Sequence, residues 1–387
     1  MIKLTYLSIL CMMIGATSLW AHRPLRILMV VERFPWCTKQ VIINQYIGLY
    51  ERGHDIYIFS EKKMENAPMD EGFLERYDIP ARTYYDTLPS DLHTYDVIIF
   101  QYGNLAKKFC YIKKQYGLKA KIVTFFRGFD ITANEEILPG EYKELFEVGD
   151  LFLPICEYFK FRLLMLGCNP DKIAVQYSGV NCLYFPFKQK KVKSREQIHI
   201  VSVGRLIEKK GFVNAVRAFA EVVKRIRIPL KYTIVGDGRQ RKNIEKLIAR
   251  YKLEKYVQLV GWKTQKELAE ILDTAHICVI PCTTSKNGTQ DAPINVLKEA
   301  MLCGLPVVST YHGGIIEIVE PGVSGYLVPE RDVHSLSRAI IHLIEDPEKW
   351  AIMGAAGRKR VRDLFDMEKL NALLEQRLYT LVEQTYL

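Results

Sequence analysis

Short apolar runs rich in β-branched residues alternate with helical patterns along most of the chain. The expected strands are 25–31, 56–59, 97–100, 122–125, 151–154 and 173–176 in the first half, then 198–203, 232–235, 257–260, 277–280, 307–309 and 326–328. Continuous apolar strands separated by helices are typical of parallel sheets that helices cover on both faces. The pattern therefore predicts an α/β protein built from two doubly wound, Rossmann-like domains.

Helical patterns fill the intervals between these strands. The main ones are 39–52, 104–116, 212–225, 239–251, 267–273, 293–303 and 333–345. Thr264 and Glu267 have the spacing of a capping box, which fixes one helix start. We expect domains at 25–188 and 189–366, joined by a lysine-rich stretch, and a C-terminal helical segment, 367–387, that packs back onto the first domain.

The N-terminal segment, residues 1–24, is the least certain part of this organisation. Its run 4–20 is largely apolar over 17 residues. As a helix this run would be about 25 Å long, which barely spans a bilayer. Three interpretations stay open: an anchor or interfacial helix, a start codon assigned too early, or a cleaved signal peptide.

Composition describes a folded protein with a basic balance. Its 387 residues are 49% hydrophobic and 25% charged, and 54 basic against 44 acidic residues give a net charge of +10. Such a charge suits phosphates or anionic lipid, whereas no zinc-finger spacing or long basic arm argues for nucleic acid. The basic run 188–195 is interpreted as a solvated linker, with attraction to an anionic membrane surface as the alternative.

Metal-binding patterns are missing from the sequence. Its nine cysteines include no CxxC pair and its eight histidines are dispersed, without HExxH or Asp-x-Asp. We therefore expect buried, reduced thiols in a cytosolic protein, no catalytic metal and no cofactor.

Asp291 and Glu299 form the first candidate site. Asp291 follows a polar turn and Glu299 lies eight positions later, within a helix that Pro293 is expected to start. A helix N-terminus attracts phosphate, and carboxylates beside it can accept hydrogen bonds from sugar hydroxyls. The alternatives are that Asp291 only caps its helix and that Glu299 is an exposed helix residue.

Arg205 and Lys210 form the second candidate site, in a strand-to-helix turn where open α/β sheets bind ligands. Arg can clamp a phosphate with two hydrogen bonds, and Lys can approach it as a point charge. Two solvated cations are the alternative. Gly236 and Gly238 mark a tight turn near this ligand, but Arg241 replaces the third glycine of a dinucleotide fingerprint, so the pattern is weak evidence for NAD.

Arg127 and Asp130 follow an expected buried strand of the first half. Polar loops at such positions often carry chemistry, and a local ion pair is the alternative.

Together these stretches resemble a retaining GT-B glycosyltransferase of family 4, glycosyl transferases group 1. The resemblance covers 25–374 and is strongest over 204–329, which contains Gly-Arg-x4-Lys-Gly, Val-Gly-Asp-Gly and the x7-spaced carboxylates. The first half resembles the colanic-acid and exopolysaccharide branch. The resemblance implies a GT-B fold, in which an acceptor-side domain and a nucleotide-sugar-binding domain face each other across a cleft.

The same resemblance implies roles for individual residues. Arg205 and Lys210 would hold the donor diphosphate, and Glu299 would bind the ribose hydroxyls. Asp291, where the family usually has Glu, would bind hydroxyls of the donor sugar. The remaining residues implied at the site are Gly204, Gly238 and the backbone of Ile294, Asn295 and Val296 for the donor, with Arg127 and Asp130 beside Asp291 in the catalytic group.

The implied activity is metal-independent hexosyl transfer with retention, from a nucleotide sugar to a lipid-linked oligosaccharide in cell-surface polysaccharide biosynthesis. The protein would be cytoplasmic, peripheral or N-terminally anchored at the inner membrane face. Two alternatives remain: a nucleotide-sugar 2-epimerase of the same fold, and a non-catalytic nucleotide-sugar-binding subunit.

Overall fold

A computed structural model of the chain describes residues 23–35, 40–64, 71–133, 140–192 and 196–383. The expectations for the apolar segment, residues 1–22, and for the last four residues, 384–387, fall outside this part of the chain. Among the helices of the described part, none combines the length and the apolar content needed to cross a bilayer.

Two six-stranded sheets form the framework, and all of their strand pairs are parallel. The first comprises β1 Arg26–Phe34, β2 Asp55–Lys63, β3 Thr83–Tyr85, β4 Val97–Phe100, β5 Lys121–Phe126 and β6 Leu151–Pro154. The second comprises β7 Ile198–Val203, β8 Leu230–Val235, β9 Val257–Leu259, β10 Ile277–Val279, β11 Val307–Thr310 and β12 Gly325–Val328. Their orders, β3-β2-β1-β4-β5-β6 and β9-β8-β7-β10-β11-β12, are the same doubly wound arrangement. The predicted fold class is therefore confirmed.

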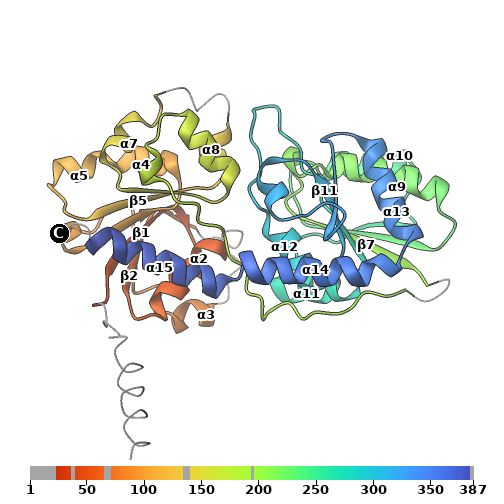
Figure 1. The fold of residues 1–387 in the computed structure, drawn as a ribbon, viewed down its shortest axis with the longest axis horizontal. Coiled ribbons are helices and arrows are strands. Elements are labelled where there is room, and N and C mark those ends of the chain that lie inside the picture. The colour runs from red at the N-terminus through yellow and green to blue at the C-terminus, as the bar shows by residue number, and fades with distance from the viewer. Residues whose placement is uncertain (1–22, 36–39, 65–70, 134–139, 193–195, 384–387) are drawn as a thin grey trace, which may run out of the picture.

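Helices connect successive strands along the chain and cover both faces of each sheet (Figure 1). Around the first sheet they are α2 Gln40–Tyr50, α3 Glu71–Arg76, α4 Gly103–Phe109, α5 Tyr111–Gln115, α6 Phe129–Thr132, α7 Lys143–Val148 and α8 Glu157–Met165, with short 3₁₀ turns η2 Leu92–Thr94 and η3 Pro170–Lys172. In the second half they are η4 Glu208–Lys210, α9 Phe212–Arg225, α10 Arg241–Arg250, α11 Gln265–Thr274, α12 Asn295–Leu302, η5 Gly313–Glu317, α13 Val333–Glu345, α14 Glu348–Leu364 and α15 Met367–Glu383.

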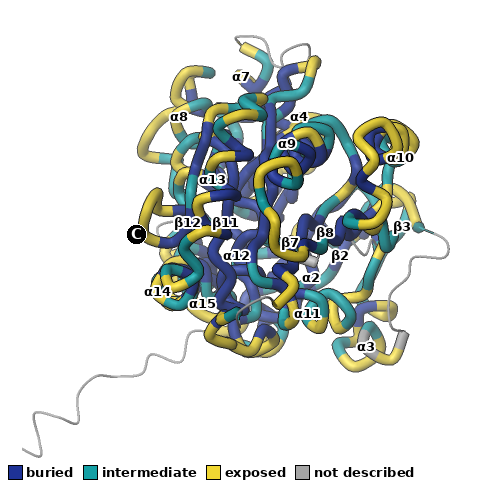
Figure 2. The backbone as a smooth tube through the Cα atoms, turned by 90° about the vertical axis from the view of Figure 1, so that its right-hand side faces the viewer, coloured by how far each residue is buried: buried dark blue, intermediate teal, exposed yellow. Residues whose placement is uncertain are grey.

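Burial explains why the strands read as unbroken apolar runs. The central strands β4 and β7 are buried at every position, since helices cover both of their faces. Figure 2 shows the same layering, with buried strands inside and exposed outer helix faces. The second sheet separates two hydrophobic clusters, one beneath α9 and α13 and the other beneath α12.

The last helix returns to the first domain. Figure 1 shows α14 along the second domain and α15 along the first, where α15 packs against α2. Leu374, Leu378 and Val382 of α15 belong to the core cluster of the first sheet. A Cβ on Gly48 of α2 would stand 1.9 Å from Nδ2 of Asn371, so only glycine permits this close packing.

The chain crosses between the domains at two places that lie side by side. The backbone N–H of Val180 donates to the carbonyl of Phe365 at 2.9 Å, and the N–H of Met367 donates to the carbonyl of Val180 at 3.1 Å. The outgoing and returning segments are therefore joined directly at the boundary.

Two local expectations were wrong, and two elements were not anticipated. Residues 173–176 form no strand; Ile173 makes only an isolated bridge to Phe152, and the side chain of Gln176 donates to the carbonyl of Leu370 in α15 instead. The expected helix 104–116 is divided at Cys110 into α4 and α5. Strand β3 and helix α14 were not anticipated. Strand β3 is only three half-buried residues long and lacks an apolar run.

The packing of α15 can be tested with Leu378, which is fully buried in the first core. Leu378→Ala should destabilise the first domain by about 2–5 kcal/mol, because it removes buried methyl groups and leaves a cavity. Urea unfolding followed by fluorescence measures this loss. Gln376→Ala on the exposed side of α15 is the control, and equal midpoints for the two variants would contradict the assignment.

Candidate functional site

The loop after β7 carries the predicted cations, and a neighbouring loop holds it in place. The N–H of Leu206 donates to the carbonyl of Asp237 at 2.8 Å, and the N–H of Gln240 donates to the carbonyl of Leu206 at 2.8 Å. A Cβ on Gly236 would lie 2.0 Å from the carbonyl oxygen of Gly204, so the two loops touch through glycine backbone. Arg205 is exposed here; its carbonyl accepts the N–H of Ile207 at 2.8 Å, but its side chain makes no hydrogen bond or ion pair with another described residue.

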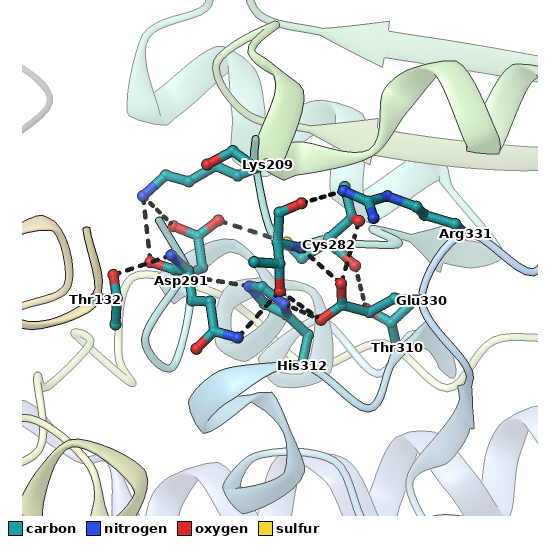
Figure 3. A network of polar contacts seen from close by, with 12 residues as sticks. Thr132, Lys209, Cys282, Asp291, Thr310, His312, Glu330 and Arg331 are labelled. Carbon is teal, nitrogen blue, oxygen red and sulfur yellow. Dashed lines mark hydrogen bonds and ion pairs between the residues drawn. The ribbon is translucent and has the colours of Figure 1, made fainter. Parts of the chain in front are cut away.

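Asp291 is the centre of an ion-pair cluster (Figure 3). Its Oδ1 lies 3.0 Å from Nζ of Lys209 and its Oδ2 lies 2.9 Å from Nζ of Lys210. The side chain of Asp291 is only 9% exposed, and those of the two lysines 14% and 12%. Burial alone would raise the pKa of Asp291, but the charges of Lys210 and Lys209 outweigh it and hold the pKa well below its usual value. The carboxylate is therefore ionised and shared between two cations.

A histidine fixes the backbone at Asp291. The N–H of Asp291 donates to Nε2 of His312 at 2.9 Å, and Nδ1 of His312 lies 2.6 Å from Oε1 of Glu330. Because a backbone N–H can only donate, Nε2 is the acceptor and the ring proton sits on Nδ1, facing Glu330. A Cβ on Gly313, whose φ is +46°, would lie 2.2 Å from the carbonyl oxygen of Asp291, so this approach requires glycine.

Glu330 ties the same histidine to the polar loop before Asp291. Its Oε2 accepts from the N–H of Thr284 at 2.7 Å, and its Oε1 accepts from the hydroxyl of Thr284 at 3.1 Å. Burial raises the pKa of Glu330, but the hydrogen bonds from His312 and Thr284 outweigh it and lower the pKa to about 2. Figure 3 shows this chain of contacts from Lys209 to Arg331.

Helix α12 begins later than expected. It spans Asn295–Leu302, with Ile294 as its N-cap and no capping side chain, so Asp291 does not cap it. The first N–H groups of any α-helix have no partner within the helix. Those of α12 therefore supply donors close to Asp291.

Glu299 and Lys298 are neighbours on α12 with different surroundings. Burial raises the pKa of Glu299 to about 7, against the opposing charge of Lys298. No other described residue forms a hydrogen bond or ion pair with the Glu299 carboxylate. Lys298 is fully buried and donates to the carbonyl of Ser178 at 2.6 Å. Burial lowers its pKa to about 7.

Arg127 reaches across three elements of the first domain. Its guanidinium donates to Oε1 of Gln45 at 2.8 Å, to Oε1 of Gln101 at 2.5 Å and to Oγ of Ser178 at 3.3 Å. It also lies 4.5 Å from the ring centre of Phe125. Burial lowers its pKa only to about 10, so the group stays cationic near neutral pH and cannot serve as a base.

Asp130 organises backbone and is only 2% exposed. Its Oδ1 accepts the N–H groups of Arg127 and Gly128, each at 2.9 Å, and its Oδ2 accepts the N–H of Gly103 at 2.8 Å. Burial raises its pKa, while these N–H groups act in the opposite direction. The geometry thus gives Asp130 a positioning role for the Arg127 loop, and its side chain makes no ion pair with Arg127 in the described structure.

Loops at the carboxyl ends of the two sheets meet at the domain boundary. The N–H of Gln290 donates to the hydroxyl of Thr132 at 3.0 Å. Glu317 of η5 accepts the first N–H groups of α8, from Glu157 at 3.0 Å and Tyr158 at 3.1 Å. These contacts place the Arg127 loop opposite the loop that carries Asp291.

The structure therefore joins some of the predicted residues directly. Asp291 and Lys210 are in contact, Arg205 lies on the same loop as Lys210, and Glu299 follows on α12. Sequence reasoning missed Lys209, His312, Glu330 and Lys298. Lys209 could have been found, because it stands beside Lys210. Among the described residues, no group of three or more His, Cys, Asp or Glu side chains is arranged to hold a metal ion.

Known proteins resemble this chain in sequence and in fold. The model of the family glycosyl transferases group 1 matches residues 185–360. The glycosyltransferase WcaL of Escherichia coli K12, assigned to colanic acid biosynthesis, is 34% identical over 289 residues, 74% of this chain and 71% of that protein. The WcaL protein of Salmonella typhimurium is 28% identical over 90% of this chain and 98% of its own length.

A solved structure has the same fold. Anabaena Alr3699/HepE in complex with UDP and glucose superimposes with a TM-score of 0.75, covers 92% of this chain and all of the Anabaena chain, and is 18% identical. The fold, the order of the motifs and the match to WcaL agree, and the chain belongs to the family glycosyl transferases group 1 and is a glycosyltransferase.

Proposed function

We propose that this glycosyltransferase moves a sugar, with retention of configuration and without a metal ion, from a nucleoside diphosphate sugar to a lipid-linked oligosaccharide. The observation that carries the proposal is the cluster of Lys209, Lys210 and Asp291 beside the N-terminus of α12. Two cations and unpaired helix N–H groups suit a diphosphate, and an ionised carboxylate suits sugar hydroxyls.

Donor binding would change the partners of this cluster. In the structure both lysines are engaged by Asp291, whose backbone is held by His312. The lysine stems are flexible, so a diphosphate can take the ammonium groups while the carboxylate stays in place. Asp291 is then released to accept hydrogen bonds from the donor sugar, which couples recognition of phosphate to recognition of sugar.

The transfer step follows from the same charges. The bond between the anomeric carbon and the diphosphate oxygen breaks, and Arg205, Lys210 and the α12 N-terminus stabilise the charge that develops on the leaving group. The acceptor hydroxyl attacks from the same face, and a phosphate oxygen takes its proton. Arg127 is permanently charged, so we assign it to orienting the sugar from the opposite domain. Glu299 would bind the ribose hydroxyls.

The acceptor and the location rest on the relatives and on charge. The WcaL proteins are assigned to colanic acid biosynthesis, and this chain carries a net charge of +10. We assign it to exopolysaccharide biosynthesis, acting peripherally on a lipid-linked saccharide at the cytoplasmic face of the membrane, where anionic lipid attracts basic proteins.

The assignment is tested with purified protein, a panel of radiolabelled nucleotide sugars and a membrane extract. We expect label in extractable lipid, and about a hundredfold slower transfer by Arg205→Ala, because one leaving-group cation is lost. Arg250→Ala, an exposed arginine at the far end of α10, is the matched control. Release of a free epimer would instead support the epimerase alternative, and binding without turnover the non-catalytic one.

A counter-intuitive result is expected from Asp291→Asn. Removing the carboxylate frees Lys209 and Lys210 for phosphate, so the variant should bind the matching nucleoside diphosphate about tenfold more tightly while losing transfer. Isothermal titration calorimetry measures the affinity. Asp273→Asn, which neutralises an exposed ion pair with Lys188, is the control. Weaker binding by Asp291→Asn would refute the exchange of partners.

Nucleotide affinity should depend on pH through Glu299. Its carboxyl, with a pKa raised to about 7 by burial, is ionised above that pH and is then the better acceptor for ribose hydroxyls. Binding should therefore strengthen as the pH rises through 7, and Glu299→Gln should lose that strengthening. The phosphates titrate alike in both proteins, so the difference between the two pH profiles reports the carboxyl together with Lys298, whose pKa of about 7 is raised by the charge of Glu299 against burial. Parallel profiles would argue against the ribose role.

A further inference from the structure

A large pocket opens in the first domain, away from the Asp291 cluster. It has a volume of about 970 Å³ and lies between α4 and the loop that follows β3. None of Lys209, Lys210 or Asp291 lines it. Pockets that hold whole small-molecule ligands measure about 300–1,000 Å³, so this one has room for considerably more than a single sugar ring.

The lining combines aromatic faces with carboxylates. Tyr102, Phe109 and Tyr116 contribute rings, and Glu32 and Asp86 contribute carboxylates. Aromatic rings offer apolar area to the hydrophobic faces of sugar rings, and carboxylates accept hydrogen bonds from hydroxyls. The remaining charges largely compensate one another, since Lys108 and Glu61 form an ion pair at the wall. This chemistry fits an uncharged, hydroxyl-rich chain rather than a phosphate or a lipid tail.

One end of the pocket is connected to the candidate site. Tyr102 follows β4 at the carboxyl edge of the first sheet, and burial raises the pKa of its hydroxyl while the charges of Arg127 and Arg205 lower it. Tyr102 therefore lies within electrostatic range of both arginines, one from each domain. Tyr116 and Leu118, beyond the end of α5, also line the pocket.

The pocket wall and the Arg127 loop are fixed to each other. One carboxylate, Asp130, holds the first N–H of α4 at Gly103 through Oδ2 and the N–H of Arg127 through Oδ1. Asn104 stands on the next position of α4, exposed at the pocket wall. The position of the pocket relative to Arg127 is thus set by one buried side chain.

We propose that this pocket binds sugars of the acceptor that lie behind the accepting sugar, so that the enzyme extends an oligosaccharide already several sugars long. The inference rests on the proposed function and specifies its acceptor. It also places the reaction in a sequence: other glycosyl transfers must first supply this oligosaccharide. Binding energy from the remote sugars would serve to hold the accepting hydroxyl in place.

The test uses lipid-linked oligosaccharides extracted from polysaccharide-producing cells and separated by the number of sugars they carry. For the wild-type protein, kcat/KM should rise by at least about tenfold from the shortest to the longer acceptors. Asn104→Arg, which places a long cation beside the pocket's carboxylates without adding an aromatic ring or disturbing the core, should abolish this rise while nucleoside diphosphate affinity stays unchanged. Gln115→Arg, exposed on α5 and outside the pocket lining, is the matched control.

Two results would overturn the inference: a wild-type rate that does not depend on acceptor length, or equal length dependence in Asn104→Arg and Gln115→Arg. A second measurement separates it from the proposed function. Saturation-transfer NMR with the oligosaccharides released from their lipid should show binding to Gln115→Arg and none to Asn104→Arg. Such binding without any transfer would reject the transferase assignment and keep the saccharide pocket. Transfer without pocket-dependent binding would keep the transferase assignment and reject the saccharide pocket.

Discussion

The shared carboxylate of Asp291 is the interaction on which the candidate site depends. Two ammonium groups this poorly exposed would repel each other and lose hydration. The single carboxylate between them compensates the repulsion and the lost hydration. The anion is itself fixed through its backbone by His312 and, behind that, by Glu330. The cluster therefore has a rigid negative centre and two flexible positive arms, which is the arrangement needed for anion exchange without movement of the loop.

A second constraint connects this cluster to the other domain. Ser178, on the first crossing between the domains, accepts a hydrogen bond from Arg127 through its hydroxyl and one from Lys298 through its carbonyl. Lys298 is the neighbour of Glu299 on α12. The group expected to contact the transferred sugar and the helix expected to contact the nucleotide thus share one residue of the connecting segment. A change in the angle between the domains would therefore move Ser178 relative to Arg127, to Lys298 or to both.

Sequence periodicity was sufficient for the framework and for part of the site. Eleven of the twelve strands were anticipated because both faces of each sheet are covered, which leaves long apolar runs; β3 was missed because it is short and half-buried. The motif spacing located Asp291, Lys210 and Glu299. It could not reveal that Asp291 is engaged by lysines, or that His312 supports it from the end of a different strand, because these contacts depend on loop geometry.

The first half also illustrates how position on a strand end can mislead. Arg127 and Asp130 were paired in sequence, and a local ion pair was the simplest alternative. In the structure their side chains part: the guanidinium points to Gln45, Gln101 and Ser178, while the carboxylate collects backbone N–H groups. Nothing in the residue types distinguishes these arrangements. Only the partners supplied by α2, by the residue that follows β4 and by the crossing segment do so.

The return of α15 to the first sheet has a consequence for how the protein is made. Ribosomes synthesise a chain from its N-terminus, and domains generally fold as units while synthesis continues. Here the earlier half lacks Leu374, Leu378 and Val382 of its own interior until the whole second domain has been translated. The clusters around the second sheet take their last members, Val361 and Phe365, from positions before those three residues, so the second domain can be complete first and the order of domain maturation is reversed.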